Sequence, residues 1–172
     1  SLKRADQRDI LFVKKNLYNK IQKNKKIVIL SSSPRRIYNL EDFIKNYLPF
    51  DLDIIEFENI RGNIPSRFEK FLKGGADGLI MAKAAVDRIL NNPIQEFNYS
   101  KEEMKKNIKK CLWTITQLSQ NPTSPGQGAL GIEVLNNNIN LIKIIKKISD
   151  QDTIDCVNLE RKILKSYGGG CH

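Results

Sequence analysis

A short apolar run that ends in Ser-Ser-Ser-Pro-Arg-Arg constrains the fold more than any other stretch of this sequence. The residues from Ile27 to Leu30 are β-branched or aliphatic and predict a buried strand. Ser33 directly before Pro34 predicts the N-cap and the first turn of a helix. The strand therefore ends where free backbone N–H groups and the positive end of a helix dipole favour anions.

Hydroxyl and guanidinium donors gather at this turn and are candidates for binding an anion: Ser31, Ser32, Ser33, Arg35 and Arg36. Guanidinium groups bind oxyanions in a bidentate geometry, and serine hydroxyls add further donors. The simpler interpretation is an ordinary capped helix whose arginines lie in solvent. The choice between an anion site and an ordinary capped helix depends on the rest of the sequence.

Strand and helix patterns alternate through the first half of the chain. Apolar runs predict strands at 10–13, 27–30, 53–60 and 78–81. Apolar residues at three and four residue spacing predict helices over 37–48, 64–73 and 82–90. This alternation indicates an α/β fold with a mainly parallel sheet. Ligands of such sheets bind at the carboxyl ends of the strands.

Five arginines follow those strand ends: Arg35, Arg36, Arg61, Arg67 and Arg88. If they face one cleft, their mutual repulsion is costly unless a ligand with several carboxylates or phosphates is bound. The sequence therefore favours a small polyanionic ligand. A structural set of salt bridges is the alternative.

The second half of the chain predicts a basic helix over 101–110 and a strand over 112–118. Turn-forming residues over 121–128 indicate a hinge or a crossing between domains. A buried strand is expected over Ala129–Leu135, followed by helices over 139–148 and 150–167. Cys171 comes after three glycines, a context that favours an accessible thiol, whereas Cys111 and Cys156 are expected to be buried.

Composition narrows the function classes. The net charge of +10 predicts an anionic partner, but the lysines are scattered as pairs and suit solvated helix faces as well as nucleic acid. Apolar runs are too short for a membrane span, and the first ten residues contain no signal-peptide core. Three cysteines without a CxxC motif indicate a reducing compartment. His172 beside Cys171 offers two ligands at most, so no metal site is predicted.

Five ordered motifs resemble the hydroxymethylbilane synthase family, also called the porphobilinogen deaminase family. They are SSSPRR, IRGNIPSR, GLIMAKAAVDRI, PGQGALGIE and LERKILKSYGGGC, and KRADQRDILFV resembles a further family segment. The resemblance runs from Lys3 to Cys171. It implies stepwise condensation of four porphobilinogens, with loss of ammonia, to 1-hydroxymethylbilane in tetrapyrrole (heme) biosynthesis.

The resemblance also implies roles for particular residues. Cys171 corresponds to the residue that carries a dipyrromethane cofactor through a thioether. The candidates for binding cofactor and substrate carboxylates are Ser31, Ser32, Ser33, Arg35, Arg36, Arg61, Arg67, Arg88, Gln127 and Arg161. The expected partner is the small polycarboxylate porphobilinogen, without nucleic acid or membrane, and a monomer is expected.

The sequence departs from the family in one respect. The family's catalytic aspartate belongs to a His-Ser-Leu-Lys-Asp type motif, which this chain does not contain; Ser1-Leu2-Lys3 is followed by Arg4. Asp6 and Asp9 are therefore not favoured as catalytic residues. We expect the chain to be truncated at both ends and to have no turnover by itself.

The family fold implies two domains like those of type II periplasmic binding proteins, with mixed, mainly parallel sheets, and a small α+β C-terminal domain. The expected divisions are 1–13 for the end of the first domain and a crossing, 14–120 for the second domain, 121–147 for the return crossing and part of the first domain, and 149–172 for the start of the third. The location is expected to be intracellular, in a cytoplasm or, with a lost targeting segment, a plastid.

Two other classes stay open. A non-catalytic module that binds small polyanions would use the arginines but have no use for Cys171. A nucleic-acid-binding protein would use the scattered lysines, and its affinity would fall steeply with salt.

Overall fold

A five-stranded mixed sheet organises residues 8–123 in the computed structural model, which describes residues 1–49 and 51–168. The strands are β1 (Asp9–Lys14), β2 (Lys26–Leu30), β3 (Ile54–Glu58), β4 (Gly78–Ala82) and β5 (Cys111–Ile115), in the order β3-β2-β4-β1-β5. β2 pairs in parallel with β3 and β4, and β1 pairs antiparallel with β4 and β5. The predicted mixed α/β sheet is confirmed.

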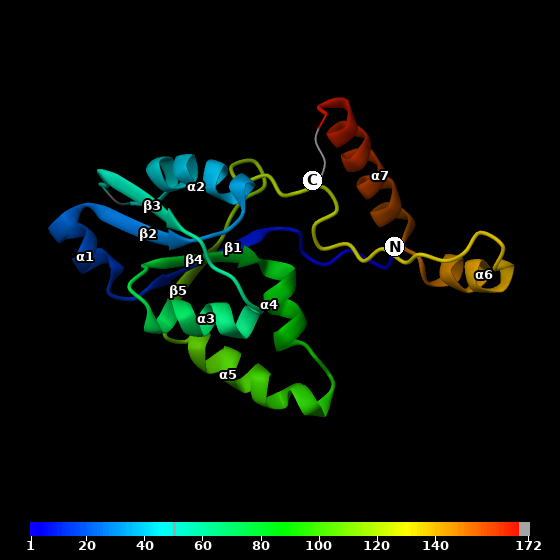
Figure 1. Cartoon of the computed structure of the whole chain (residues 1–172), viewed down its shortest axis with the longest axis horizontal. Coiled ribbons are helices and arrows are strands. Elements are labelled where there is room, and N and C mark those ends of the chain that lie inside the picture. The colour runs from blue at the N-terminus through cyan, green and yellow to red at the C-terminus, as the bar shows by residue number, and fades with distance from the viewer. Residues whose placement is uncertain (50, 169–172) are drawn as a thin grey trace. The chain divides into compact units, whose positions relative to one another are not determined.

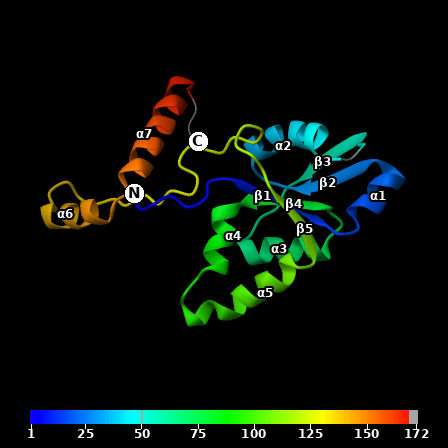
Figure 2. The ribbon, with the colours of Figure 1, turned by 180° about the vertical axis from the view of Figure 1, so that it is seen from behind.

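Helices cover both faces of this sheet (Figures 1 and 2). One face carries α1 (Leu17–Asn24) and α2 (Pro34–Tyr47). The other carries α3 (Ile64–Lys73), α4 (Lys83–Leu90) and α5 (Asn98–Ile108), which follows a short 3-10 helix, η1 (Gln95–Phe97). Because successive side chains of a strand point to opposite faces, one sheet supplies two apolar cores.

The two cores show this alternation on β1. Leu11 packs with α1 and α2, whereas Phe12 packs with α3, where its ring lies edge-on to Phe68 with the centroids 4.8 Å apart. All three side chains have no exposed surface. β1 lies between β4 and β5, and this unit begins at Arg8.

Capping side chains begin two of the helices, and the Ser33 cap agrees with the prediction from the sequence. Ser33 caps α2 by accepting the backbone N–H of Arg36, and Pro34 is the first residue of that helix. Asn63 caps α3 in the same way through the backbone N–H of Ser66, at 2.9 Å. The local signals of these two βα turns therefore determine where each helix begins.

Residues 1–7 and 124–168 form a second unit with α6 (Ile139–Ile148) and α7 (Gln151–Ser166). Asp150 caps α7 through the backbone N–H of Thr153, and the Thr153 hydroxyl accepts the backbone N–H of Arg4. Gly128 has a φ of +82°, and a Cβ there would lie 2.7 Å from the carbonyl oxygen of Ala5. A glycine is needed where these two segments run so close.

The strand predicted over residues 129–135 is absent, and this prediction was wrong. The segment is irregular, and its large side chains Leu130, Ile132 and Leu135 are exposed. A strand requires a partner edge for its backbone groups, and the described residues of this unit contain no other strand. Nor is any helix among the described residues long and apolar enough to span a bilayer.

Candidate functional site

The serine-arginine turn lies at the sheet edge formed by the carboxyl ends of the parallel strands. The turn follows the last residue of β2, and Asp9 at the start of the antiparallel β1 lies opposite Ala82 at the end of β4. An antiparallel strand begins where its parallel neighbours end. The first residue of β1 is thereby brought to the edge where α/β sheets bind ligands.

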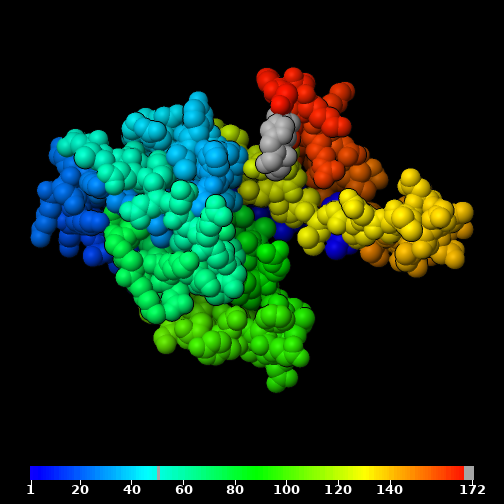
Figure 3. Space-filling view, viewed as in Figure 1, coloured from blue at the N-terminus to red at the C-terminus, as the bar shows by residue number. Residues whose placement is uncertain are grey.

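The three serines of the turn contact backbone groups. The Ser31 side chain accepts the N–H of Ser33 at 3.3 Å. The Ser32 hydroxyl donates to the Ile60 carbonyl at 2.7 Å and accepts the Ile60 N–H at 2.8 Å. These bonds hold the connection between β3 and α3 against the turn. Figure 3 shows atoms of α2 and α3 at the surface in the view of Figure 1. The hydroxyls thus shape the turn.

Arg35 and Arg36 converge on the carboxylate of Asp9. Arg35 Nη2 donates to Oδ2 at 2.7 Å, and Arg36 Nη2 donates to Oδ1 at 2.9 Å. Asp9 has no exposed surface, and the arginine side chains are 22% and 16% exposed. The Nε atoms of both arginines are buried without a hydrogen-bond partner among the described residues. Arg36 is therefore held through Nη2 alone, and its Nη1 has no partner among the described residues.

Asn121 extends the cluster toward β5. Its side-chain amide donates to Asp9 Oδ2 at 3.2 Å and to the Thr116 hydroxyl at 2.8 Å. Its Oδ1 accepts Arg35 Nη1 at 3.3 Å, and the same Nη1 donates to the Pro122 carbonyl at 2.7 Å. Arg35 is more completely engaged than Arg36 as a result.

The electrostatics of the cluster favour a charged aspartate. Burial by itself would raise the pKa of Asp9. The hydrogen bonds and positive charges of Arg36 and Arg35 outweigh burial and hold the pKa below its ordinary value. One negative and two positive charges leave a net positive site, which suits an anionic ligand.

Asp9 and Asn121 are site residues that were not predicted from the sequence. Asp9 was considered only as a catalytic aspartate and was not favoured. Its place immediately before a predicted strand was the available signal, but that signal becomes informative only once β1 is known to run antiparallel beside β4.

The other arginines predicted from strand ends lie on the connections and helices that follow β3 and β4. Arg61 lies between β3 and α3, Arg67 lies in the second turn of α3, and Arg88 is exposed on α4. Arg67 Nε donates to the Gly62 carbonyl at 2.7 Å. None of the three forms an ion pair with a carboxylate in the part of the chain that the structure describes. Their convergence on one ligand remains a prediction.

Gln127 and Arg161 belong to the second unit. Gln127 Nε2 donates to the Gln7 carbonyl at 2.5 Å, and Arg161 is exposed on α7. The neighbouring Glu160 binds both Nη atoms of Arg4, at 2.5 and 3.1 Å. Cys171 lies outside the described residues.

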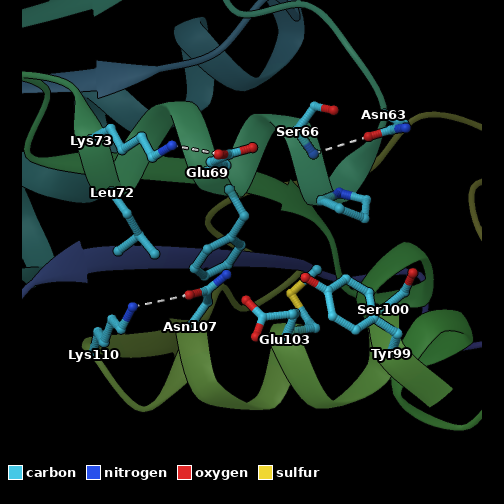
Figure 4. Close-up of a pocket in the computed structure, with 13 residues that line it drawn as sticks. Asn63, Ser66, Glu69, Leu72, Lys73, Tyr99, Ser100, Glu103, Asn107 and Lys110 are labelled. Atoms are coloured by element: carbon cyan, nitrogen blue, oxygen red, sulfur yellow. Dashed lines mark hydrogen bonds and ion pairs between the residues drawn. The ribbon is translucent and has the colours of Figure 1, made fainter.

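A pocket of about 480 Å³ between α3 and α5 contains none of the predicted site residues (Figure 4). Two pairs of its polar groups contact each other: Lys73 pairs with Glu69 at 2.6 Å, and Lys110 donates to Asn107 at 3.3 Å. The described residues also include no group of three or more His, Cys, Asp or Glu side chains that could hold a metal ion.

Comparison with known proteins identifies the family. Residues 1–143 match the family model described as "Porphobilinogen deaminase, dipyromethane cofactor binding domain". The chain belongs to the porphobilinogen deaminase family. The matched residues include the whole sheet and the Asp9, Arg35 and Arg36 cluster.

Curated relatives agree with this assignment. The porphobilinogen deaminase of Caldicellulosiruptor saccharolyticus is 33% identical over 99% of this chain and 50% of its own length. The probable porphobilinogen deaminase of Sulfurisphaera tokodaii is 31% identical over 95% of this chain and 46% of its own length. The porphobilinogen deaminase of Chlorobaculum parvum is 32% identical over 98% of this chain and 46% of its own length. The chain thus spans about half the length of the relatives that it matches.

Proposed function

We propose that this chain is part of a hydroxymethylbilane synthase and binds the carboxylates of a dipyrromethane cofactor and of the pyrrole chain that grows from it. The cluster of Asp9, Arg35 and Arg36 is the observation that carries the proposal. Two guanidinium groups lie side by side on one buried carboxylate, and their buried Nε atoms lack partners among the described residues. Arg36 Nη1 has no partner among the described residues, and the side chain is 16% exposed. Pyrrole acetates and propionates would supply an acceptor for this donor.

The proposed reaction joins four porphobilinogen molecules. Each condensation breaks the C–N bond of an aminomethyl group, releases ammonia and forms a C–C bond to the α-carbon of the terminal ring, which loses its proton. When bound, the dipyrromethane supplies the first such α-carbon. Arg35 and Arg36 would hold carboxylates of the rings, with Arg61, Arg67, Arg88, Gln127 and Arg161 at further positions of the growing chain.

Cys171 is proposed as the attachment residue, and the proposal rests there on the sequence motif alone. The wider architecture is proposed to consist of domains like those of type II periplasmic binding proteins and a third domain that begins near residue 149. We propose a monomer in a cytoplasm or plastid. The chain by itself is expected to produce no hydroxymethylbilane because the family's catalytic aspartate motif is absent from its sequence.

Intact mass measured under denaturing conditions tests the cofactor proposal. Protein purified after coexpression with a catalytically complete hydroxymethylbilane synthase and a porphobilinogen source should exceed 19.7 kDa by the mass of a dipyrromethane, and peptide mapping should place the adduct on Cys171. Cys171→Ser is the matched control and should lack the adduct. A bare chain under these conditions would contradict covalent loading. Carboxylate binding with no adduct in either protein would favour the non-catalytic module.

A further inference from the structure

We propose that Asp9 is a positioning residue, whose buried carboxylate sets the places of the Arg35 and Arg36 guanidinium groups for ligand carboxylates. The inference rests on the proposed function for the identity of the ligand. It assigns to Asp9 a role that does not require contact with the ligand.

Helix geometry explains why a positioning group is needed. Arg35 and Arg36 are consecutive in the first turn of α2, and neighbouring residues of a helix point about 100° apart. Their side chains would therefore diverge. One carboxylate oxygen binds each guanidinium, at 2.7 and 2.9 Å, and brings the two groups together.

Charge is the second reason. Two adjacent guanidinium groups repel each other, and repulsion is strong where water is partly excluded. The carboxylate of Asp9 offsets one of the two positive charges, so the pair can stay together before any ligand binds. From the sequence, a ligand was expected to offset this repulsion. The structure assigns part of that task to the protein.

Asp9 is itself firmly held. It is paired within the sheet with Ala82 on β4, and its carbonyl oxygen accepts the backbone N–H of Thr116 at 3.0 Å. Asn121 donates to its carboxylate, and Asp9 has no exposed surface. Because the carboxylate is fixed by a central strand, its position determines where the two guanidinium groups lie.

The hydrogen bonds of the arginines distinguish this cluster from a purely structural salt bridge. Arg4 directs Nε to the Gln127 carbonyl and both Nη atoms to Glu160, so each of its nitrogens has an acceptor. Arg36, by contrast, has Asp9 as its one side-chain partner among the described residues, and its Nε is buried without an acceptor. Donors held in place but left unpaired are what a carboxylate site requires.

The test compares Asp9→Asn with Asp77→Asn in the full 172-residue chain. Asp77 is a matched control because it is 3% exposed and ion-paired, but its partners are Lys20 and the backbone of Val28. Calorimetric titration with porphobilinogen should show affinity about tenfold or more weaker for Asp9→Asn, which corresponds to the loss of one good charged contact. Affinity should change less than about twofold for Asp77→Asn.

Side-chain NMR gives a readout independent of the ligand. In the unaltered protein the Nε–H groups of Arg35 and Arg36 should be rigid, with order parameters of about 0.8 or above, whereas exposed Arg88 should fall below about 0.6. Folded Asp9→Asn should lose this rigidity at both arginines, and folded Asp77→Asn should keep it. The measurement on unaltered protein applies even where Asp9→Asn fails to fold.

The outcomes separate the two proposals. Mobile Arg35 and Arg36 side chains in the unaltered protein, or equal porphobilinogen affinity in folded Asp9→Asn, would overturn the positioning role. Absence of porphobilinogen binding by the unaltered chain, with both arginines rigid, would count against the proposed ligand while supporting the positioning by Asp9.

Discussion

Replacing Asp9 with asparagine should destabilise the sheet unit by about 3 kcal/mol. The change keeps the size of the side chain but removes the charge that two guanidinium groups share. A hydrogen bond to a charged group contributes about 1.5–3 kcal/mol, so two such bonds set an upper bound of about 6. The arginine side chains stay 16% and 22% exposed, and water can replace part of the loss.

Asp77→Asn is the control for removing a buried carboxylate. Lys20, its cationic partner, is 37% exposed and can turn to water, and an asparagine oxygen can still accept the backbone N–H of Val28. We therefore expect a cost of about 1 kcal/mol. The difference of about 2 kcal/mol between the two variants measures how much the contacts with the two arginines contribute to the free energy of unfolding.

Urea unfolding followed by tryptophan fluorescence measures both costs. Trp113 is the single tryptophan and lies on β5 opposite Phe12 of β1, so its signal reports on the sheet unit. A midpoint shift without a change in slope gives the difference in stability. Equal losses for Asp9→Asn and Asp77→Asn, or a loss below about 1 kcal/mol for Asp9→Asn, would refute the reasoning.

The pH dependence of this difference follows from the lowered pKa of Asp9. Burial opposes its ionisation, but the Arg36 and Arg35 contacts hold its folded pKa below the ordinary value of 3.8. The unfolded chain then binds the proton more readily, so stability from Asp9 is fully present above the unfolded pKa and is lost as pH falls through the folded pKa. The difference in unfolding free energy between the unaltered protein and Asp9→Asn should be constant near neutral pH and should decrease below about pH 4. A gap that persists unchanged down to pH 2 would contradict an ionised Asp9.

Two further predictions concern backbone approach and thiol reactivity. Gly128→Ala should speed hydrogen exchange of the Ala5 amide, which donates to the Gly128 carbonyl at 2.9 Å. The reason is that a Cβ at residue 128 would meet the Ala5 carbonyl oxygen and that the φ of Gly128 is positive. Gly131→Ala is the control, because the space around its Cβ is open, and it should leave that exchange unchanged. Cys111 is buried, and burial raises the pKa of its thiol, whereas Cys156 is exposed. Mass mapping after brief alkylation should find Cys156 modified well before Cys111, and the reverse order would contradict the burial.

Local patterns in the sequence determined much of the sheet unit. Apolar runs located β1, β2 and β4, the Ser-Pro turn located the start of α2, and the spacing of apolar residues located α3. These elements were predictable because their signals act within a few residues: β-branched runs suit strands, and capping side chains bind backbone groups three positions away. The arginines at the strand ends were recognised for the same reason.

Only the tertiary structure decided which residues partner the arginines. The order β3-β2-β4-β1-β5 inserts the first strand beside β4 in the opposite direction, and this brings Asp9 to the same edge as Arg35 and Arg36. The tertiary structure also decided the conformation of Ala129–Leu135. This segment is apolar enough for a strand, but it is irregular because the described residues of its unit contain no strand with which it could pair. Pairing between distant segments depends on geometry that no local pattern contains, because a strand or a carboxylate is stabilised by partners that the fold brings to it.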